Sequence, residues 1–148
     1  MNDVLIVVNE IAGQGRAKKL WESWQDHLPF AFTLLKTEYS GHATDIAKKY
    51  AEASQDPLLI IAIGGDGTAH EILSGTIGYN HVRVGVVSAG SGNDFARAFF
   101  VFQTLEQLKE YVLEYQTAEQ MDIGVLNTNS DTFHFINNAG FGFDAHVV

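Results

Sequence analysis

Alternating apolar and amphipathic segments are the feature of this sequence that most constrains its fold. Residues 4–8 and 58–63 are uninterrupted apolar runs, and residues 82–87 repeat the scheme. Such runs are typical of strands buried on both faces, as in a parallel sheet, and a further strand is predicted over residues 30–35. Helical spacing of apolar side chains follows these strands, at residues 17–28, 43–51, 68–73 and 104–115. The order predicts an α/β fold: a three-layer, doubly wound, mostly parallel sheet.

The pattern changes near residue 120. Residues 121–126 and 132–136 are strand-like runs joined by the polar turn 127–131, with no helix between them. This arrangement indicates a hairpin rather than a crossover. We therefore predict an α/β domain over residues 1–120 and the beginning of an all-β second domain over residues 121–148. The sequence ends without a polar tail, so we expect it to be part of a longer protein.

Composition excludes several classes of function. The formal net charge of −9 argues against nucleic acid as a partner, because phosphate backbones are bound by clustered Lys and Arg. The chain has no cysteine, which excludes disulfides and thiolate metal sites. The apolar run at residues 4–8 lacks a basic leader and is too short to span a bilayer. These features favour a cytoplasmic protein.

Three glycine-bearing loops follow three of the predicted strands, at residues 9–15, 64–68 and 90–94. Glycine permits positive φ and lets backbone amides approach an anion, and each following helix adds a favourable dipole. Asp66, held between glycines at a strand end, is well placed to hold Mg²⁺ against phosphates, and Thr68 is a candidate cap for the next helix. Neither the P-loop lysine nor the dinucleotide fingerprint follows these strands. The loops predict a site for a phosphate-rich ligand.

The loops together resemble a known family. Gly64-Gly65-Asp66-Gly67-Thr68 with Glu71, followed by Gly90-Ser91-Gly92-Asn93-Asp94-Phe95-Ala96-Arg97, resembles the paired signatures of the diacylglycerol-kinase catalytic family. The first motif alone is shared with NAD kinases, whereas the Gly-Asn-Asp-Phe-Ala-Arg stretch is not. Residues 121–124, 135–137 and 140–144 resemble the entry to the family's second domain, a β-sandwich.

The resemblance implies an ATP-dependent lipid kinase that transfers a phosphate from Mg-ATP to a lipid hydroxyl such as that of diacylglycerol. The residues implied to line the ATP site are Asn9, Gly13, Thr37, Gly64, Gly65, Asp66, Gly67, Thr68, Glu71 and Ser91. Asp66 is also the implied metal ligand, and Asp66, Asp94 and Asp122 are the implied catalytic carboxylates. Capping of a helix is the alternative role for Asp94. Glu10 stands where the family usually has proline, and its charge is unfavourable near phosphate unless it points away.

The resemblance also implies that the general base and most lipid contacts lie in the second domain. We therefore expect residues 1–148 alone to be inactive in lipid phosphorylation, with peripheral membrane contact made through the missing domain. An unpaired apolar hairpin edge favours self-association into homo-oligomers. Two alternative functions stay open: an NAD kinase-like enzyme and a non-catalytic nucleotide-binding module.

Overall fold

The computed structural model describes residues 3–91, 96, 99–115, 118 and 120–135. The chain divides into two compact units, residues 1–118 and residues 119–148. Each unit is described by itself. The predicted domain boundary at residue 120 stays a prediction.

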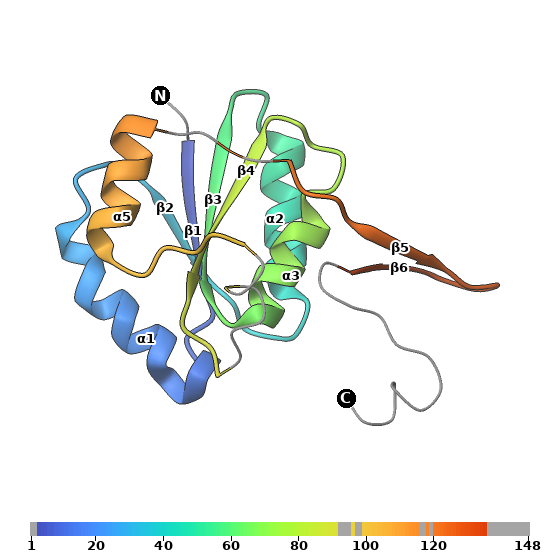
Figure 1. The fold of residues 1–148 in the computed structure, drawn as a ribbon, viewed down its shortest axis with the longest axis horizontal. Coiled ribbons are helices and arrows are strands. Elements are labelled where there is room, and N and C mark those ends of the chain that lie inside the picture. The colour runs from blue at the N-terminus through green and yellow to red at the C-terminus, as the bar shows by residue number, and fades with distance from the viewer. Residues whose placement is uncertain (1–2, 92–95, 97–98, 116–117, 119, 136–148) are drawn as a thin grey trace. The chain divides into compact units, whose positions relative to one another are not determined.

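A parallel sheet forms the centre of the first unit (Figure 1). Its strands, within the described residues, are β1 (Asp3–Val8), β2 (Thr33–Lys36), β3 (Leu58–Gly64) and β4 (Val82–Ser88). They are arranged in the order β2-β1-β3-β4, and every neighbouring pair is parallel. Along its whole length β1 pairs with β3, from Asp3 opposite Leu58 to Val8 opposite Ile63. The predicted doubly wound α/β fold is confirmed.

Helices cover both faces of this sheet (Figure 1). They are α1 (Ala12–Trp24) with the short 3₁₀ turn η1 (Gln25–His27), α2 (His42–Ala53), α3 (Asp66–Gly75), and α5 (Leu105–Glu110), which continues as the π-helical turn η2 (Tyr111–Tyr115). α1 and α5 lie on one face, and α2 and α3 on the other. Right-handed crossovers account for this division. The connections β2→β3 and β3→β4 move in one direction across the sheet, whereas the connection β1→β2 moves in the other.

The core follows the two-residue alternation of the strands. Side chains of β1 and β3 that face α1 and α5 form one buried cluster with the helices: Val4, Ile6, Val8, Leu59, Ile61 and Ile63 with Ala17, Trp21, Trp24 and Leu108. The alternate positions of these strands face α2 and α3 and are equally buried. The central strands are thus apolar on both faces, as the uninterrupted sequence runs predict.

Two elements differ from the sequence prediction at their boundaries. β2 begins at Thr33 rather than at residue 30, because pairing with β1 starts at Thr33 opposite Leu5. Phe32 instead packs edge-on against Trp21, with 5.6 Å between ring centroids. The helix predicted over residues 104–115 changes from α to π geometry at Tyr111. Helix α5 begins with a capping box in which Thr104 and Gln107 satisfy each other's backbone amides.

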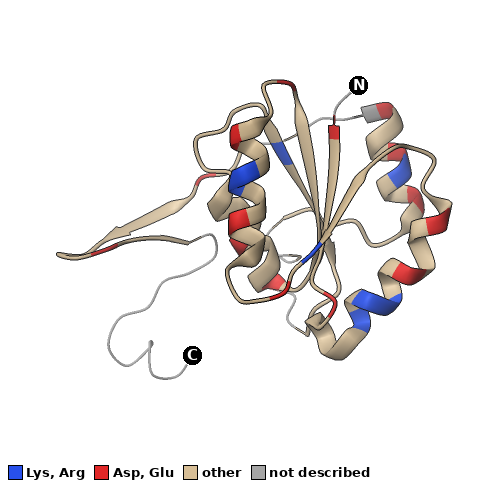
Figure 2. Ribbon diagram, turned by 180° about the vertical axis from the view of Figure 1, so that it is seen from behind, with Lys and Arg blue, Asp and Glu red and all other residues tan. Residues whose placement is uncertain are grey.

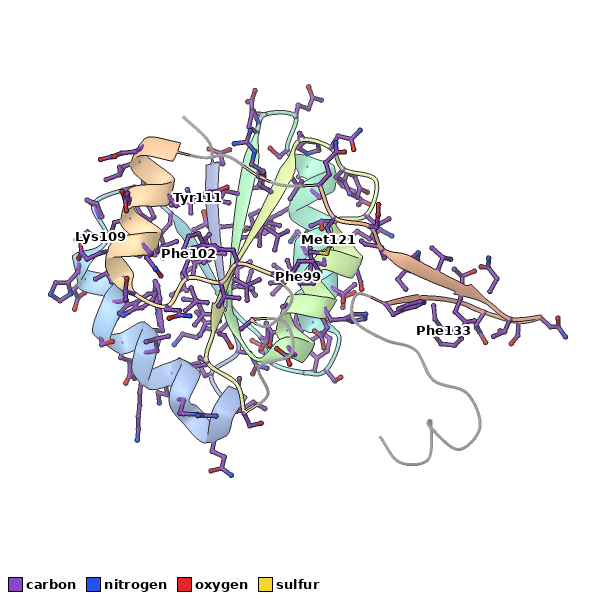
Figure 3. All side chains as sticks on the ribbon, in the orientation of Figure 1. Phe99, Phe102, Lys109, Tyr111, Met121 and Phe133 are labelled. Carbon is purple, nitrogen blue, oxygen red and sulfur yellow. The ribbon has the colours of Figure 1, made fainter. Side chains whose placement is uncertain are left out.

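An aromatic segment covers part of the β4 edge. The backbone N–H of Phe102 donates to the Val86 carbonyl at 2.8 Å, and Phe102 pairs in parallel with Val87. The Phe102 ring contacts Tyr111 with 5.3 Å between centroids, and Figure 3 shows both side chains beside the sheet. The segment thus covers part of the edge of β4, where backbone N–H and C=O groups would otherwise be unpaired.

The second unit contains an antiparallel hairpin of β5 (Gly124–Asn127) and β6 (Thr132–Phe135). Its turn is closed by Thr128, whose backbone N–H donates to the Asp131 carbonyl at 2.8 Å and whose hydroxyl accepts from the Asp131 N–H at 3.0 Å. The predicted hairpin is confirmed, although β5 begins at Gly124 rather than at residue 121. The predicted β-sandwich stays a prediction.

Close packing of α2 against α3 generates the first testable prediction. A Cβ added at Gly75 would lie 2.5 Å from the Thr44 carbonyl oxygen and 3.0 Å from the Ala47 Cβ. Gly75→Ala must therefore separate two helices, and we expect it to lower the free energy of unfolding by about 1–3 kcal/mol despite alanine's better helix propensity. Urea unfolding followed by tryptophan fluorescence measures this, since Trp21 and Trp24 are buried.

Gly67→Ala is the matched control, because it makes the same substitution in the same helix where no atom lies within 4 Å. Helix propensity alone predicts no loss of stability in this variant. Equal unfolding curves for the two variants would show that the α2–α3 contact does not constrain the fold.

Candidate functional site

The strand order marks one place in the sheet where a ligand is expected. The chain leaves β1 toward β2, then crosses back so that β3 lies on the other side of β1. In open parallel sheets the loops diverge at such a reversal and leave a crevice beyond the carboxyl ends of the strands. Here the loops after β1 and β3 border the crevice, and these are two of the three glycine-bearing loops.

Sheet hydrogen bonds continue past the strand ends and fix the loops. The Asn9 N–H donates to the Ile63 carbonyl at 2.9 Å, and the Ala89 N–H donates to the Gly64 carbonyl at 2.7 Å. Thr37, just after β2, donates its N–H to the Val8 carbonyl at 3.0 Å. The first residue of each loop is therefore held as rigidly as the strand before it, which suits a preformed site.

Gly65 in the second loop and Gly90 in the third are required by close packing rather than by unusual backbone angles. Gly65 has extended angles, φ −92° and ψ −173°, that any residue adopts. A Cβ at Gly65 would lie 3.3 Å from the Gly90 Cα, and a Cβ at Gly90 would collide with the Gly65 backbone. The expectation that positive φ explains these glycines is therefore wrong for this loop, because two backbones meet where side chains have no room.

Positive φ does occur in the first loop. Gly13, Gln14 and Gly15 have φ of 62°, 58° and 89°, so the regular part of α1 begins only after Gly15. Gly13 also lies against the Ala89 carbonyl, where a Cβ would collide. This single loop uses both properties of glycine, conformational freedom and small size.

The three loops enclose an open cavity of about 340 Å³. Most of the residues that the sequence predicts for a ligand site lie together here. The lining residues are Asn9, Ala12, Gly13, Gly65, Asp66, Gly67, Thr68, Gly90 and Ser91.

Helix α3 begins inside this cavity, at Asp66. The first intrahelical bond runs from the Ala69 N–H to the Gly65 carbonyl at 3.2 Å. The backbone N–H groups of a helix's first turn have no partner within the helix, and together with the dipole they favour an anion. Thr68 lies within this turn, so the expectation that it caps the helix is wrong.

Asn9 and Thr68 join the first loop to the second. The Asn9 amide Nδ2 donates to the Thr68 hydroxyl at 3.1 Å, and Thr68 is only 5% exposed. Gly64 is required by this contact, because a Cβ there would lie 2.5 Å from the Thr68 Oγ1. Gly64 itself ends β3 and is not among the cavity residues. The direct ligand contacts expected of Asn9 and Thr68 stay predictions.

Glu10 is not among the residues that line the cavity. Its carboxylate is paired with the Lys36 ammonium on β2, with 2.8 Å between the charged atoms. Glu10 stands where the family usually has proline, and Lys36 neutralises its negative charge at the edge of the sheet.

Glu71 and Thr37 lie outside the cavity lining. The Glu71 carboxylate accepts from the N–H groups of Gly41 and Ala43 at 3.0 and 3.2 Å, so it caps helix α2 from the neighbouring helix. Thr44 strengthens this contact by donating its hydroxyl to the Glu71 carbonyl at 2.9 Å. Glu71 therefore holds the β2–α2 connection, the loop that follows Thr37.

Two aromatic rings are stacked in that connection. Tyr39 and His42 have ring centroids 4.3 Å apart and nearly parallel planes. The Tyr39 hydroxyl donates to Asp45 at 2.9 Å, and this hydrogen bond, together with the neighbouring carboxylates, raises the pKa of Tyr39 above its usual value. Tyr39 thus stays a neutral hydrogen-bond donor at physiological pH.

The structure does not test the roles of two predicted catalytic carboxylates. Asp94 lies outside the described residues. Asp122 belongs to the second unit, which is described separately. Their catalytic roles stay predictions.

Sequence reasoning missed Arg16. Its guanidinium donates from Nε to the Gly13 carbonyl at 3.1 Å and from Nη2 to the Gly90 carbonyl at 2.6 Å. Arg16 therefore joins the first and third loops at the cavity. The signal in the sequence was a basic residue directly after the Gly-Gln-Gly loop.

Neither a metal-holding cluster nor a membrane-spanning helix occurs in the part of the chain that the structure describes. No group of three or more His, Asp or Glu side chains there is placed to hold a metal ion. No helix there is long and apolar enough to cross a membrane. Charged residues of both signs are distributed along the helices, as the colours of the ribbon in Figure 2 show.

Comparisons with known proteins agree with this architecture. The chain is 30% identical, over 156 aligned positions, to a Bacillus subtilis (strain 168) protein provisionally named lipid kinase YtlR, covering 99% of this chain and 50% of that protein. It is 38% identical over 108 positions to the diacylglycerol kinase of the same organism, covering 72% of this chain and 33% of that enzyme. The crystal structure of a diacylglycerol kinase from Bacillus anthracis str. Sterne matches with a TM-score of 0.65 and 25% identity, covering 89% of this chain and 48% of that one.

The chain thus spans half or less of the length of these relatives. The family model described as "Diacylglycerol kinase catalytic domain" matches residues 3–126, most of the sequence. With the fold, the loops and this match in agreement, the chain belongs to the diacylglycerol kinase catalytic domain family.

Proposed function

We propose that the chain is the nucleotide-binding part of an ATP-dependent lipid kinase, which transfers a phosphate from Mg-ATP to a lipid hydroxyl such as that of diacylglycerol. The observation that carries this proposal is the cavity where Asp66 and the first turn of α3 meet two other glycine loops. Phosphoryl transfer needs positioning and charge stabilisation more than covalent chemistry from the protein. A preformed cradle of backbone amides supplies both.

The polyphosphate is the part of ATP that this cavity suits best. The first-turn amides of α3 favour negative charge, and the glycine loops let the backbone approach closely. Asn9, Thr68 and Ser91 offer polar side chains on the same walls. Thr37 lies at the carboxyl end of β2. We propose that it lies beside the nucleotide rather than beside the transferred phosphate.

Asp66 fits the role of a Mg²⁺ ligand. Mg²⁺ in phosphoryl-transfer enzymes is commonly held by one or two carboxylates, with phosphate oxygens and water completing its octahedral shell. Asp66 is the charged side chain among the cavity residues that the structure describes. The metal would supply charge neutralisation on the phosphates, and Asp66 would fix its position relative to α3.

The lipid and the proton acceptor are proposed to bind outside these residues. The relatives are about twice as long as this chain or longer. A lipid kinase needs a base within hydrogen-bonding reach of the attacking hydroxyl, and the described residues that line the cavity offer no such group besides the proposed metal ligand Asp66. We propose that a second domain provides the base, the acyl-chain contacts and the peripheral membrane surface.

The role of Asp66 is tested by Asp66→Asn. In the complete enzyme we expect turnover to be lost. In the 148-residue chain we expect metal-free ATP binding to persist while the gain in affinity with Mg²⁺ disappears, because the amide is a poor ligand for a hard cation. Calorimetric titration with ATP, with and without Mg²⁺, measures this.

Asp56→Asn is the charge-matched control, since Asp56 is exposed in the turn before β3, at the opposite end of that strand. It should retain both turnover and the Mg²⁺ effect. Wild-type turnover in Asp66→Asn would end the assignment of Asp66.

The packing of the second loop against the third is tested by a graded pair of substitutions at Gly65. Gly65→Ala adds a Cβ 3.3 Å from the Gly90 Cα, a contact that a small shift relieves. Gly65→Val adds two further methyl groups there, and we expect it to displace the third loop and weaken ATP binding at least about tenfold. Unchanged ATP affinity in a folded Gly65→Val variant, checked by circular dichroism, would contradict this role.

The division between binding and chemistry is tested on the chain itself. We expect residues 1–148 to bind ATP weakly, with assistance from Mg²⁺, and to respond to NAD alone with no thermal shift. We expect no transfer of labelled phosphate to diacylglycerol in mixed micelles, because the base and lipid contacts are proposed to lie elsewhere. Transfer at a rate comparable with that of the complete enzyme would overturn the two-domain proposal.

A further inference from the structure

Arg16 is the basic side chain that joins two walls of the cavity. It is the first residue after the positive-φ segment of α1, and its two carbonyl partners, Gly13 and Gly90, are 77 residues apart in the sequence and both line the cavity. The guanidinium therefore lies across the junction of the first and third loops.

No acidic side chain among the described residues neutralises the charge of Arg16. Four lysines pair with carboxylates: Lys18 with Glu22, Lys36 with Glu10, Lys48 with Glu52 and Lys109 with Glu106. Within the described residues Arg16 forms no such pair, and both of its acceptors are neutral carbonyls. A guanidinium has five N–H donors, and two are used here. The others, on an exposed side chain, are available to an incoming ligand.

The position of Arg16 in its helix is unfavourable without an anion. Regular helix begins here, and a cation in a first turn opposes the helix dipole. The first turn of α1 contains no acidic residue to offset it. A phosphate beside Arg16 would satisfy the guanidinium and the amide end of the helix at once.

We propose that Arg16 binds a phosphate of the nucleotide and, through its two carbonyl contacts, closes the first loop onto the third. This inference rests on the proposed nucleotide function and adds a binding residue to it. Planar guanidinium groups suit phosphate oxygens because they donate two parallel hydrogen bonds. Arg16 is not itself a lining residue, but its positive charge beside Gly13 and Gly90 would balance the negative charge of Asp66 in the cavity wall.

The test compares Arg16→Gln with wild type in the 148-residue chain, with ATP and inorganic triphosphate as probes in calorimetric titrations. Glutamine keeps hydrogen-bond donors but removes the charge. We expect affinity for both probes to fall about tenfold, as for loss of one charge-assisted hydrogen bond. The dependence of ATP affinity on salt concentration should also become weaker, because one fewer charge takes part.

Lys18→Gln is the matched control, since it removes the same charge from an exposed position on the same helix. It should leave ATP affinity close to wild type. Arg16→Lys keeps the positive charge but lacks the planar guanidinium group. We expect its ATP affinity to lie between that of Arg16→Gln and that of wild type.

Three outcomes are decisive. If Arg16→Gln weakens ATP binding but leaves its salt dependence unchanged, Arg16 acts only through loop packing and the phosphate contact is wrong. If it matches Lys18→Gln in affinity, the whole role of Arg16 is wrong while nucleotide binding stands. If the wild-type chain binds neither ATP nor triphosphate, the proposed function fails together with this inference.

Discussion

The pairing of β1 with β3 is the constraint on which the rest of this structure depends. The two strands are joined along their full length, and most of their side chains are inaccessible to solvent. A strand buried on both faces has to be apolar throughout, and its loops have to leave the sheet at its ends. Because the chain reverses direction across the sheet between these strands, their two following loops diverge and leave a crevice. The cavity is thus a consequence of topology before any site residue is considered.

Glycine then determines how close the loops come to one another. In the second and third loops the requirement is steric, since the backbones of Gly65 and Gly90 are in contact. In the first loop the requirement is also conformational, because Gly13 and Gly15 have positive φ. Small residues at these points allow peptide groups rather than side chains to form the walls. Such walls present amides at short range, which is the arrangement that phosphate recognition uses elsewhere.

Much of this was predictable from the sequence, and the rest depended on long-range contacts. Uninterrupted apolar runs predict buried parallel strands, and their carboxyl ends gather the loops that contain Asn9, Asp66 and Ser91. The boundary of β2 was not predictable, because it depends on where pairing with β1 begins. Glu71 shows the same limit: it lies in a recognisable motif, yet its carboxylate holds Gly41 and Ala43, about thirty residues earlier in the sequence. No local pattern specifies that partner.

Electrostatics explains why so few charged residues are needed at the cavity. The chain has a formal net charge of −9, which at long range repels a polyphosphate. Attraction must therefore come from groups that act at contact distance, where salt and solvent screen less. In the proposed nucleotide complex, helix amides at Asp66, one guanidinium at Arg16 and a metal carried by the nucleotide would meet this requirement, and the pairing of Glu10 with Lys36 removes a nearby negative charge. A site of this kind gains its selectivity for phosphate from geometry rather than from net charge, so an acidic chain can hold an acidic ligand.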